Sequence, residues 1–145
     1  MIMTSTLWDE VSRFFKPYGT NDHWGDPMKM KYEIVYGLFH LRKFIDRPIH
    51  VHCGFEKRTD KPTSTHNFGM AVDCHADGIH PGDLFIAASR FIHFRGIGVY
   101  PYWNNPGVHL DCREYEKRMQ PEARWGRNKK GEYVKLDWDF LKELK

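Results

Sequence analysis

The sequence predicts a single α+β domain over residues 1–145, with helices packed on one side of a small antiparallel β-sheet. Three observations predict it. The length of 145 residues is that of one domain. Hydrophobic residues (41%) and charged residues (28%) occur in globular proportions. Helical patterns come first along the chain and several short strand patterns follow, which is typical of an α+β domain rather than a doubly wound one.

Three segments have the apolar spacing of helices. The first covers residues 7–16 and follows Ser5 or Thr6, either of which is a good N-cap. The second, residues 28–44, has the most regular helical spacing of apolar residues. The third covers residues 83–94. Together they predict three helices that bury one apolar stripe each.

Short alternating segments predict the strands. They lie at residues 49–55, 68–74, 97–100 and 108–112, and residues 133–136 indicate a short edge strand. In the first strand, alternation places Cys53 on the core side, and His50 and His52 on the opposite side. Cys74 and Cys112 fall on the core side of their own strands, where a thiol acts as a small apolar group.

Composition excludes several classes of protein. The net charge is only +3, and basic residues are interleaved with acidic ones, so we expect no nucleic-acid partner. No apolar run of about 18 residues is present, so we expect no membrane span. The first residues lack a basic stretch followed by an apolar one, which predicts synthesis in the cytoplasm without a secretory signal. The three cysteines do not suggest a disulfide framework. We expect a monomer.

Histidines and aspartates in two segments suggest a metal site. His109 and Asp111 are two residues apart on a strand and therefore share a face. The simpler interpretation is that both lie on the wet face of an edge strand. With His66 and Asp73, however, His109 completes a mixed set of three ligands. Three protein ligands and an open fourth position are what catalytic zinc requires.

Other polar clusters have simpler explanations. His50 and His52 are a rival metal-binding pair, but no third ligand is spaced to complete it. His75 lies close to Asp73 in the sequence and could support that residue. Tyr102 and Trp103 could stack on a substrate or pack in a hairpin.

The order and spacing of two motifs resemble a known family. Residues 64–73 match the pattern S-x-H-x-x-G-x-A-x-D, and the segments GIGVYP (96–101) and HLDCR (109–113) follow. This double motif resembles the zinc D-Ala-D-Ala carboxypeptidase family of peptidases, especially its short phage-like branch, over roughly residues 48–113. The resemblance implies a hedgehog/DD-peptidase-like fold. It also implies one Zn²⁺ ion held by His66, Asp73 and His109.

The activity implied by the resemblance is hydrolysis of peptide bonds next to D-amino acids in peptidoglycan stem peptides or cross-links. Members act as carboxypeptidases or endopeptidases, including phage lysis enzymes. The substrate would therefore be reached after release or delivery of the protein to the cell wall.

Two positions depart from the family pattern. Many members have an acidic general base three residues before the last zinc ligand, where this chain has Pro106. We therefore expect Asp111 to accept the proton from water, or alternatively to orient a ligand. Many members also have an arginine directly after the preceding strand, where this chain has Glu56. We expect Arg58 to grip the substrate carboxylate or the polarised carbonyl.

Further substrate contacts are expected from Ser64, Tyr100 and Arg113. A competing hypothesis follows from Pro106: the chain could be a non-catalytic, zinc-containing module that binds the cell wall or belongs to a phage particle.

Overall fold

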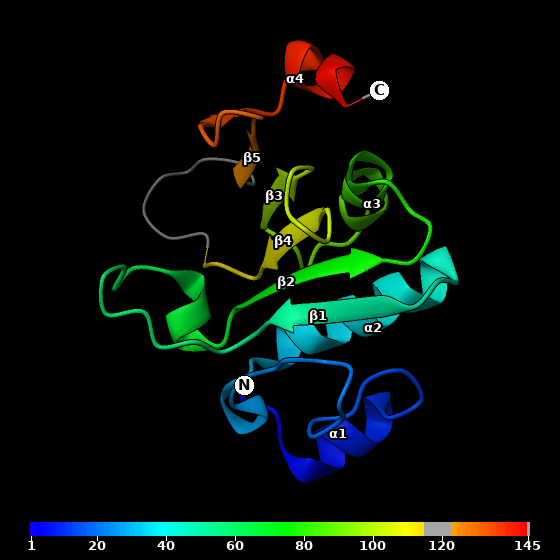
Figure 1. The fold of residues 1–145 in the computed structure, drawn as a ribbon. Coiled ribbons are helices and arrows are strands. Elements are labelled where there is room, and N and C mark those ends of the chain that lie inside the picture. Colours follow the sequence, from blue (N-terminus) through cyan, green and yellow to red (C-terminus); the bar gives the residue numbers. More distant parts are fainter. Residues whose placement is uncertain (115–122, 145) are drawn as a thin grey trace.

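The computed structural model describes residues 1–114 and 123–144, and these form an α+β fold with one six-stranded sheet (Figure 1). The sheet order is β1-β2-β4-β3-β5-β6. The strands are β1 Ile49–Cys53, β2 Ala71–Ala76, β3 Gly96–Tyr100, β4 Gly107–Asp111, β5 Ala123–Arg127 and β6 Tyr133–Lys135. The α-helices are α1 Ser5–Val11, α2 Tyr32–Ile45, α3 Pro81–Ala88 and α4 Trp138–Glu143, and two 3-10 turns are η1 Pro27–Lys29 and η2 Thr65–Phe68.

The α+β class is confirmed, but the sheet is mixed rather than wholly antiparallel. Strands β3 and β5 are parallel neighbours, with Gly96 opposite Ala123. The reason lies in where β4 ends. Asp111, the last residue of β4, also lies opposite Gly96 at the start of β3. Since β5 begins at the same end of the sheet, it runs in the direction of β3.

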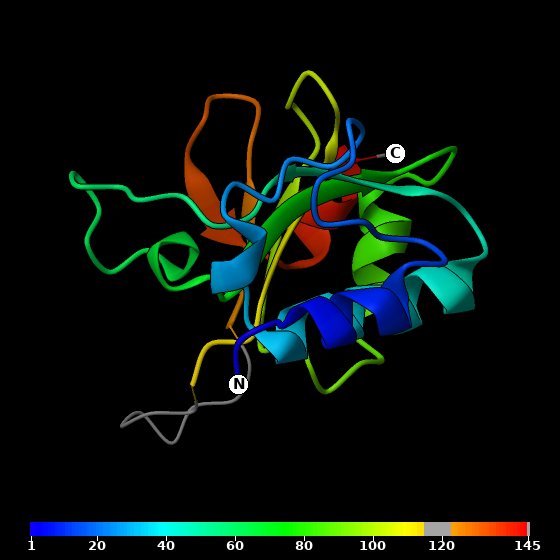
Figure 2. The ribbon, with the colours of Figure 1, turned by 90° about the horizontal axis from the view of Figure 1, so that it is seen from below.

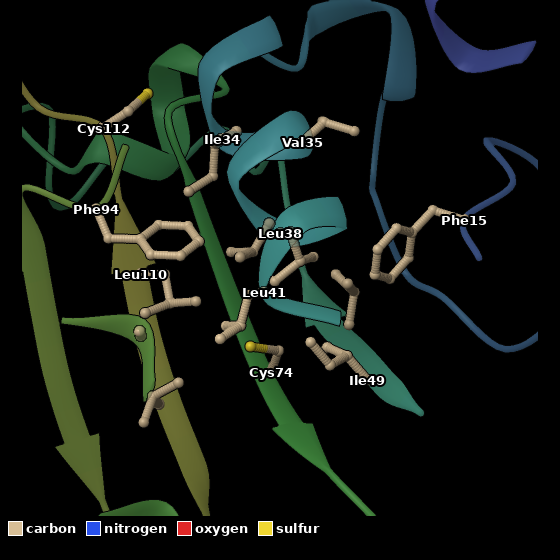
Figure 3. Close-up of a cluster of buried hydrophobic side chains, with 14 of the residues drawn as sticks. Phe15, Ile34, Val35, Leu38, Leu41, Ile49, Cys74, Phe94, Leu110 and Cys112 are labelled. Carbon is tan, nitrogen blue, oxygen red and sulfur yellow. The ribbon is translucent and has the colours of Figure 1, made fainter. Parts of the chain in front are cut away.

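The helices cover one face of the sheet, and this face forms the core. Figure 2 shows α1 and α2 on the same side of the sheet as α3. The α2 side chains of Ile34, Leu38 and Leu41 are fully buried, and Figure 3 shows them between the sheet residue Leu110 and Phe15. Each such side chain contributes roughly 1.5–3 kcal/mol through burial. Helix α4 belongs to the same core through Phe140.

The helix ends differ from the sequence expectations by a few residues. Helix α1 begins at Ser5, because the Leu7 backbone N–H donates to the side chain of Thr4, the N-cap. Helix α2 starts only at Tyr32, after η1. Helix α3 begins two residues before the expected 83–94 segment and ends at Ala88. Residues 89–94 are not helical, and Phe94 turns back into the core.

The strand expectations are close. The hairpin of β3 and β4 is antiparallel, and β6 lies at the sheet edge, as predicted. Strand β2 begins at Ala71 rather than at residue 68, because residues 65–68 form η2. Cys74 and Cys112 are buried in the core, as expected. Among the described residues, none of the helices is long and apolar enough to cross a membrane.

A β-bulge changes the face on which one predicted core residue lies. The pairing of β1 with β2 shifts between Val51 and Cys53, so that Cys53 lies opposite Asp73. A bulge adds one residue to a strand and reverses the alternation that follows it. The prediction that Cys53 lies on the core side is therefore wrong: its side chain is on the face away from the helices, together with Asp73.

Candidate metal centre

The three predicted zinc ligands meet on the sheet face opposite the helices. Asp73 on β2 and His109 on β4 are direct cross-strand partners. His66 comes from η2, and Gly69 and Met70, which connect η2 to β2, donate backbone hydrogen bonds to the carbonyls of His66 and Thr65. His66 is 1% exposed and His109 is 8% exposed. The antiparallel register therefore brings together side chains that are far apart in the sequence.

The three donor atoms form a small triangle. His66 Nε2 lies 3.3 Å from Asp73 Oδ1 and 3.3 Å from His109 Nδ1, and His109 Nδ1 lies 2.9 Å from Asp73 Oδ1. Zinc bonds of 2.0–2.2 Å in tetrahedral geometry require donor atoms about 3.3–3.5 Å apart. Two edges match, and the third needs to lengthen by about 0.4 Å. The donor set and its spacing thus fit one zinc ion without rearrangement of the backbone.

Hydrogen bonds on the far side of each imidazole leave the correct nitrogen free. His66 Nδ1 donates to the Gly54 carbonyl at 2.7 Å. His109 Nε2 donates to Asp111 Oδ2 at 2.9 Å. With those protons fixed, the lone pairs of His66 Nε2 and His109 Nδ1 face Asp73. Such outer contacts orient metal-binding histidines and fix their tautomers.

Asp111 supports His109 from behind and does not face the centre of the triangle. Its side chain is 0% exposed. Arg113 donates to both carboxylate oxygens, from Nε to Oδ1 at 2.8 Å and from Nη2 to Oδ2 at 2.6 Å. Because both oxygens are occupied and solvent is excluded, this geometry favours the alternative role for Asp111, orienting a ligand, over the expected role of proton acceptor.

The charges at the centre are strongly coupled. Burial would lower the pKa of His66, but its hydrogen bonds with Asp73 and Cys53 outweigh burial and raise the pKa to about 9. Burial would also lower the pKa of His109, but its hydrogen bonds with Asp111 and Asp73 outweigh burial and raise this pKa to about 9 as well. Burial would raise the pKa of Asp73, yet the two histidines hold it well below its usual range. Without a metal, the carboxylate stabilises two protonated imidazoles.

Cys53 is a further donor beside this centre, because the bulge turns it onto this face. Its Sγ lies 3.6 Å from His66 Nδ1, and Cys53, His66 and Asp73 each offer a donor atom within 4.8 Å of one another. However, His66 Nδ1 is the nitrogen already bonded to Gly54. Cys53 therefore lies on the outer side of His66, while Asp73 and His109 face Nε2. The strand alternation predicted the opposite face for Cys53 and so missed this contact.

An open cavity of about 810 Å³ lies beside the triangle. The expected substrate residues Arg58, Ser64, Tyr100 and Arg113 all line it, together with His66 and His109. Arg58 donates a hydrogen bond to Glu56, and Arg113 donates hydrogen bonds to Asp111. Two aromatic residues that the motifs did not identify as substrate contacts, Trp125 and Tyr133, complete the wall. They come from β5 and β6, the strands beyond the motif region.

Two glycines of the GIGVYP segment make room for this wall. A Cβ atom at Gly98 would lie 2.4 Å from Nε1 of Trp125, and one at Gly96 would lie 2.3 Å from Oδ2 of Asp111. Because glycine leaves this space open, the Trp125 indole fills it. The indole donates to the Tyr100 hydroxyl at 2.9 Å, and its ring lies 5.4 Å from the His109 ring. The alternation of glycine on β3 therefore allows the aromatic wall and the buried carboxylate to lie against the sheet.

No protein-family model matches the chain. A search of curated proteins finds no similar sequence either. Membership of the zinc carboxypeptidase family therefore remains a prediction from the motifs.

Proposed function

We propose that this protein is a zinc-dependent hydrolase of peptide bonds adjacent to D-amino acids in peptidoglycan stem peptides or cross-links. The observation that carries the proposal is the triangle of His66, Asp73 and His109 at the side of an open cavity. A closed set of four protein donors would favour a structural zinc site, whereas three donors beside a cavity favour a catalytic one.

The metal would supply the chemistry that protein side chains lack. A zinc ion with an open coordination position polarises a carbonyl and makes a nucleophile from water near neutral pH. Asp111 and Gly54 keep the two imidazoles in the tautomers that can bind such an ion. Arg113 holds Asp111 in place for that task.

The cavity has the shape and charge for a peptide that ends in a carboxylate. Its volume of about 810 Å³ lies in the range of small-ligand sites. Arg58, Lys61 and Arg113 line it, against one acidic residue, Asp60. Both arginines are paired, but the partner of Arg58 is the exposed Glu56, whereas Arg113 is held by the buried Asp111, so Arg58 is the arginine better suited to turn to a substrate. Tyr100 and Trp125 offer flat surfaces against which a peptide can pack.

A second candidate function is a non-catalytic module that binds zinc and the cell wall. It is favoured by the position of Asp111, since this carboxylate is buried behind His109 and cannot meet a water in the cavity. In that case, the protein would bind zinc and wall fragments without turnover.

The two functions are separated by hydrolysis assays on purified peptidoglycan and on synthetic stem peptides ending in D-Ala-D-Ala. The matched control substrate is the same peptide ending in L-Ala-L-Ala. We expect cleavage of the D-form that stops with a chelator and returns with Zn²⁺, and no cleavage by the His66→Ala variant. Turnover that persists after complete zinc removal would rule out the mechanism. Zinc binding and wall binding without turnover would establish the module.

A further inference from the structure

A second group of histidines lies on the same sheet face, beyond the metal centre. His50 on β1 and His75 on β2 are direct cross-strand partners, and their rings stack with centroids 4.8 Å apart. The His52 ring lies 4.7 Å from His75, and the two rings share a hydrogen bond between Nε2 and Nδ1. Three imidazoles therefore converge because the antiparallel ladder fixes their positions.

A carboxylate joins this group. Asp77 follows His75 by two residues, just past the end of β2, and its Oδ1 accepts from His50 Nε2 at 2.8 Å. One donor atom from each of His50, His75 and Asp77 lies within 4.8 Å of the other two. The sequence alone offered His50 and His52 without a third ligand. The pairing of β1 with β2 supplies the missing donors.

The cluster is open to solvent. A cavity of about 360 Å³ is lined by His23, His50, His52 and His75, together with Asn21, Val51 and Asn105. His50 and Asp77 are 36% and 54% exposed. An ion could therefore enter, and a tetrahedral site would need the donor atoms about 3.3 Å apart.

We propose that His50, His75 and Asp77 form a second metal site, with His52 as an additional donor. Imidazole-rich sets prefer borderline divalent ions, and Zn²⁺, Cu²⁺ and Ni²⁺ are the class that this site would take. The site is weaker than the first one. Its donors are more exposed, since the His50 and Asp77 side chains are 36% and 54% exposed, whereas those of His66 and Asp73 are 1% and 15% exposed.

The spacing of their ligands on β2 favours two separate centres over one two-metal site. Asp73 and His75 are alternate residues on β2, so they are roughly 6.5–7 Å apart along the strand. Metal ions that act together on one substrate lie about 3.5–4 Å apart. The second site does not depend on the hydrolase proposal, because none of its ligands belongs to the first triangle.

Zinc stoichiometry by equilibrium dialysis and metal analysis tests this inference. We expect the unmodified protein to bind two Zn²⁺ ions, the second at least tenfold more weakly. His75→Ala should keep only the tighter ion, and His66→Ala should retain the weaker one. The matched control is His40→Ala, which replaces an exposed histidine on α2, and this variant should bind two Zn²⁺ ions.

Several results would overturn the second site. They are a single zinc ion at saturation in the unmodified protein that His66→Ala no longer binds, or two ions retained by His75→Ala. If circular dichroism shows that His75→Ala does not fold, His50→Ala and Asp77→Asn provide the same test at exposed positions. Failure of the first centre has a different signature, because His66→Ala and the unmodified protein would then bind the same number of ions.

Discussion

The two roles that Asp111 could play predict different consequences of Asp111→Asn. This substitution keeps the shape of the side chain but removes its charge. In the structure the carboxylate is fully buried, accepts two hydrogen bonds from the Arg113 guanidinium and accepts one from His109 Nε2. An amide retains one acceptor oxygen only. Either Arg113 or His109 would therefore lose its partner.

The magnitude follows from the burial of the two partners. Removing one member of a buried ion pair destabilises a protein by about 3–5 kcal/mol. The Arg113 side chain is 39% exposed and can regain part of its hydration, so we expect about 2–3 kcal/mol at this site. Loss of the contact that orients His109 should weaken zinc binding by about 10–100-fold.

The assays are urea unfolding of the zinc-free protein and zinc competition with a chromophoric chelator. Asp9→Asn, an exposed position on α1, is the matched control and should change stability by less than about 0.5 kcal/mol. The opposite pattern would refute our reasoning: unchanged stability and zinc affinity in Asp111→Asn, with turnover reduced by about 10²–10⁴-fold, is the signature of a proton acceptor.

Three further predictions address the two ligand histidines, the packing of Trp125 against Gly98, and substrate binding by Arg58. In the zinc-free protein, the pKa values of the two ligand histidines are about 9, above the unfolded value of about 6.5. The free energy of unfolding that these histidines contribute is fully present below pH 6.5 and should be lost as the pH rises to 9. The midpoint of urea unfolding, measured in the presence of a chelator, can follow this loss. A midpoint that does not change over this pH range would contradict the coupling of the histidines to Asp73. Gly98→Ala should destabilise the fold by about 1–3 kcal/mol through overpacking against Trp125, whereas Gly19→Ala, with its nearest neighbour at 3.7 Å, should be neutral in the same unfolding assay. Arg58→Ala should raise KM for peptides with a free carboxyl terminus by about tenfold while zinc affinity is unchanged, and an unaltered KM would remove Arg58 from substrate binding.

Much of the fold could be predicted from local patterns, since several helices and strands follow one clear periodicity in the spacing of their apolar residues. The long helix α2 and the β3–β4 hairpin are examples. The convergence of Asp73 with His109 could be anticipated from the motifs, and the cross-strand register provides its physical basis. Strand alternation also placed Asp111 correctly on the same face as His109.

Features that depend on tertiary contacts could not be predicted in this way. The bulge in β1 leaves no local signature, yet it moves Cys53 from the core face to the metal centre. Strand β5 is short and polar, and it forms because β3 offers it a parallel edge. The buried state of Asp111 depends on Arg113, whose reach to both carboxylate oxygens is not visible in a spacing pattern. Residues 115–122, which follow the second motif, lie outside the described residues.

The location of a bound zinc ion tests the central claim most directly. Crystals grown with Zn²⁺ and measured on both sides of the zinc absorption edge would give its position from anomalous scattering. We predict an ion about 2.0–2.2 Å from His66 Nε2, His109 Nδ1 and an Asp73 oxygen, with its fourth position open to the cavity. An ion held by Cys53 in place of His109, or closed off by a fourth protein donor, would contradict the account.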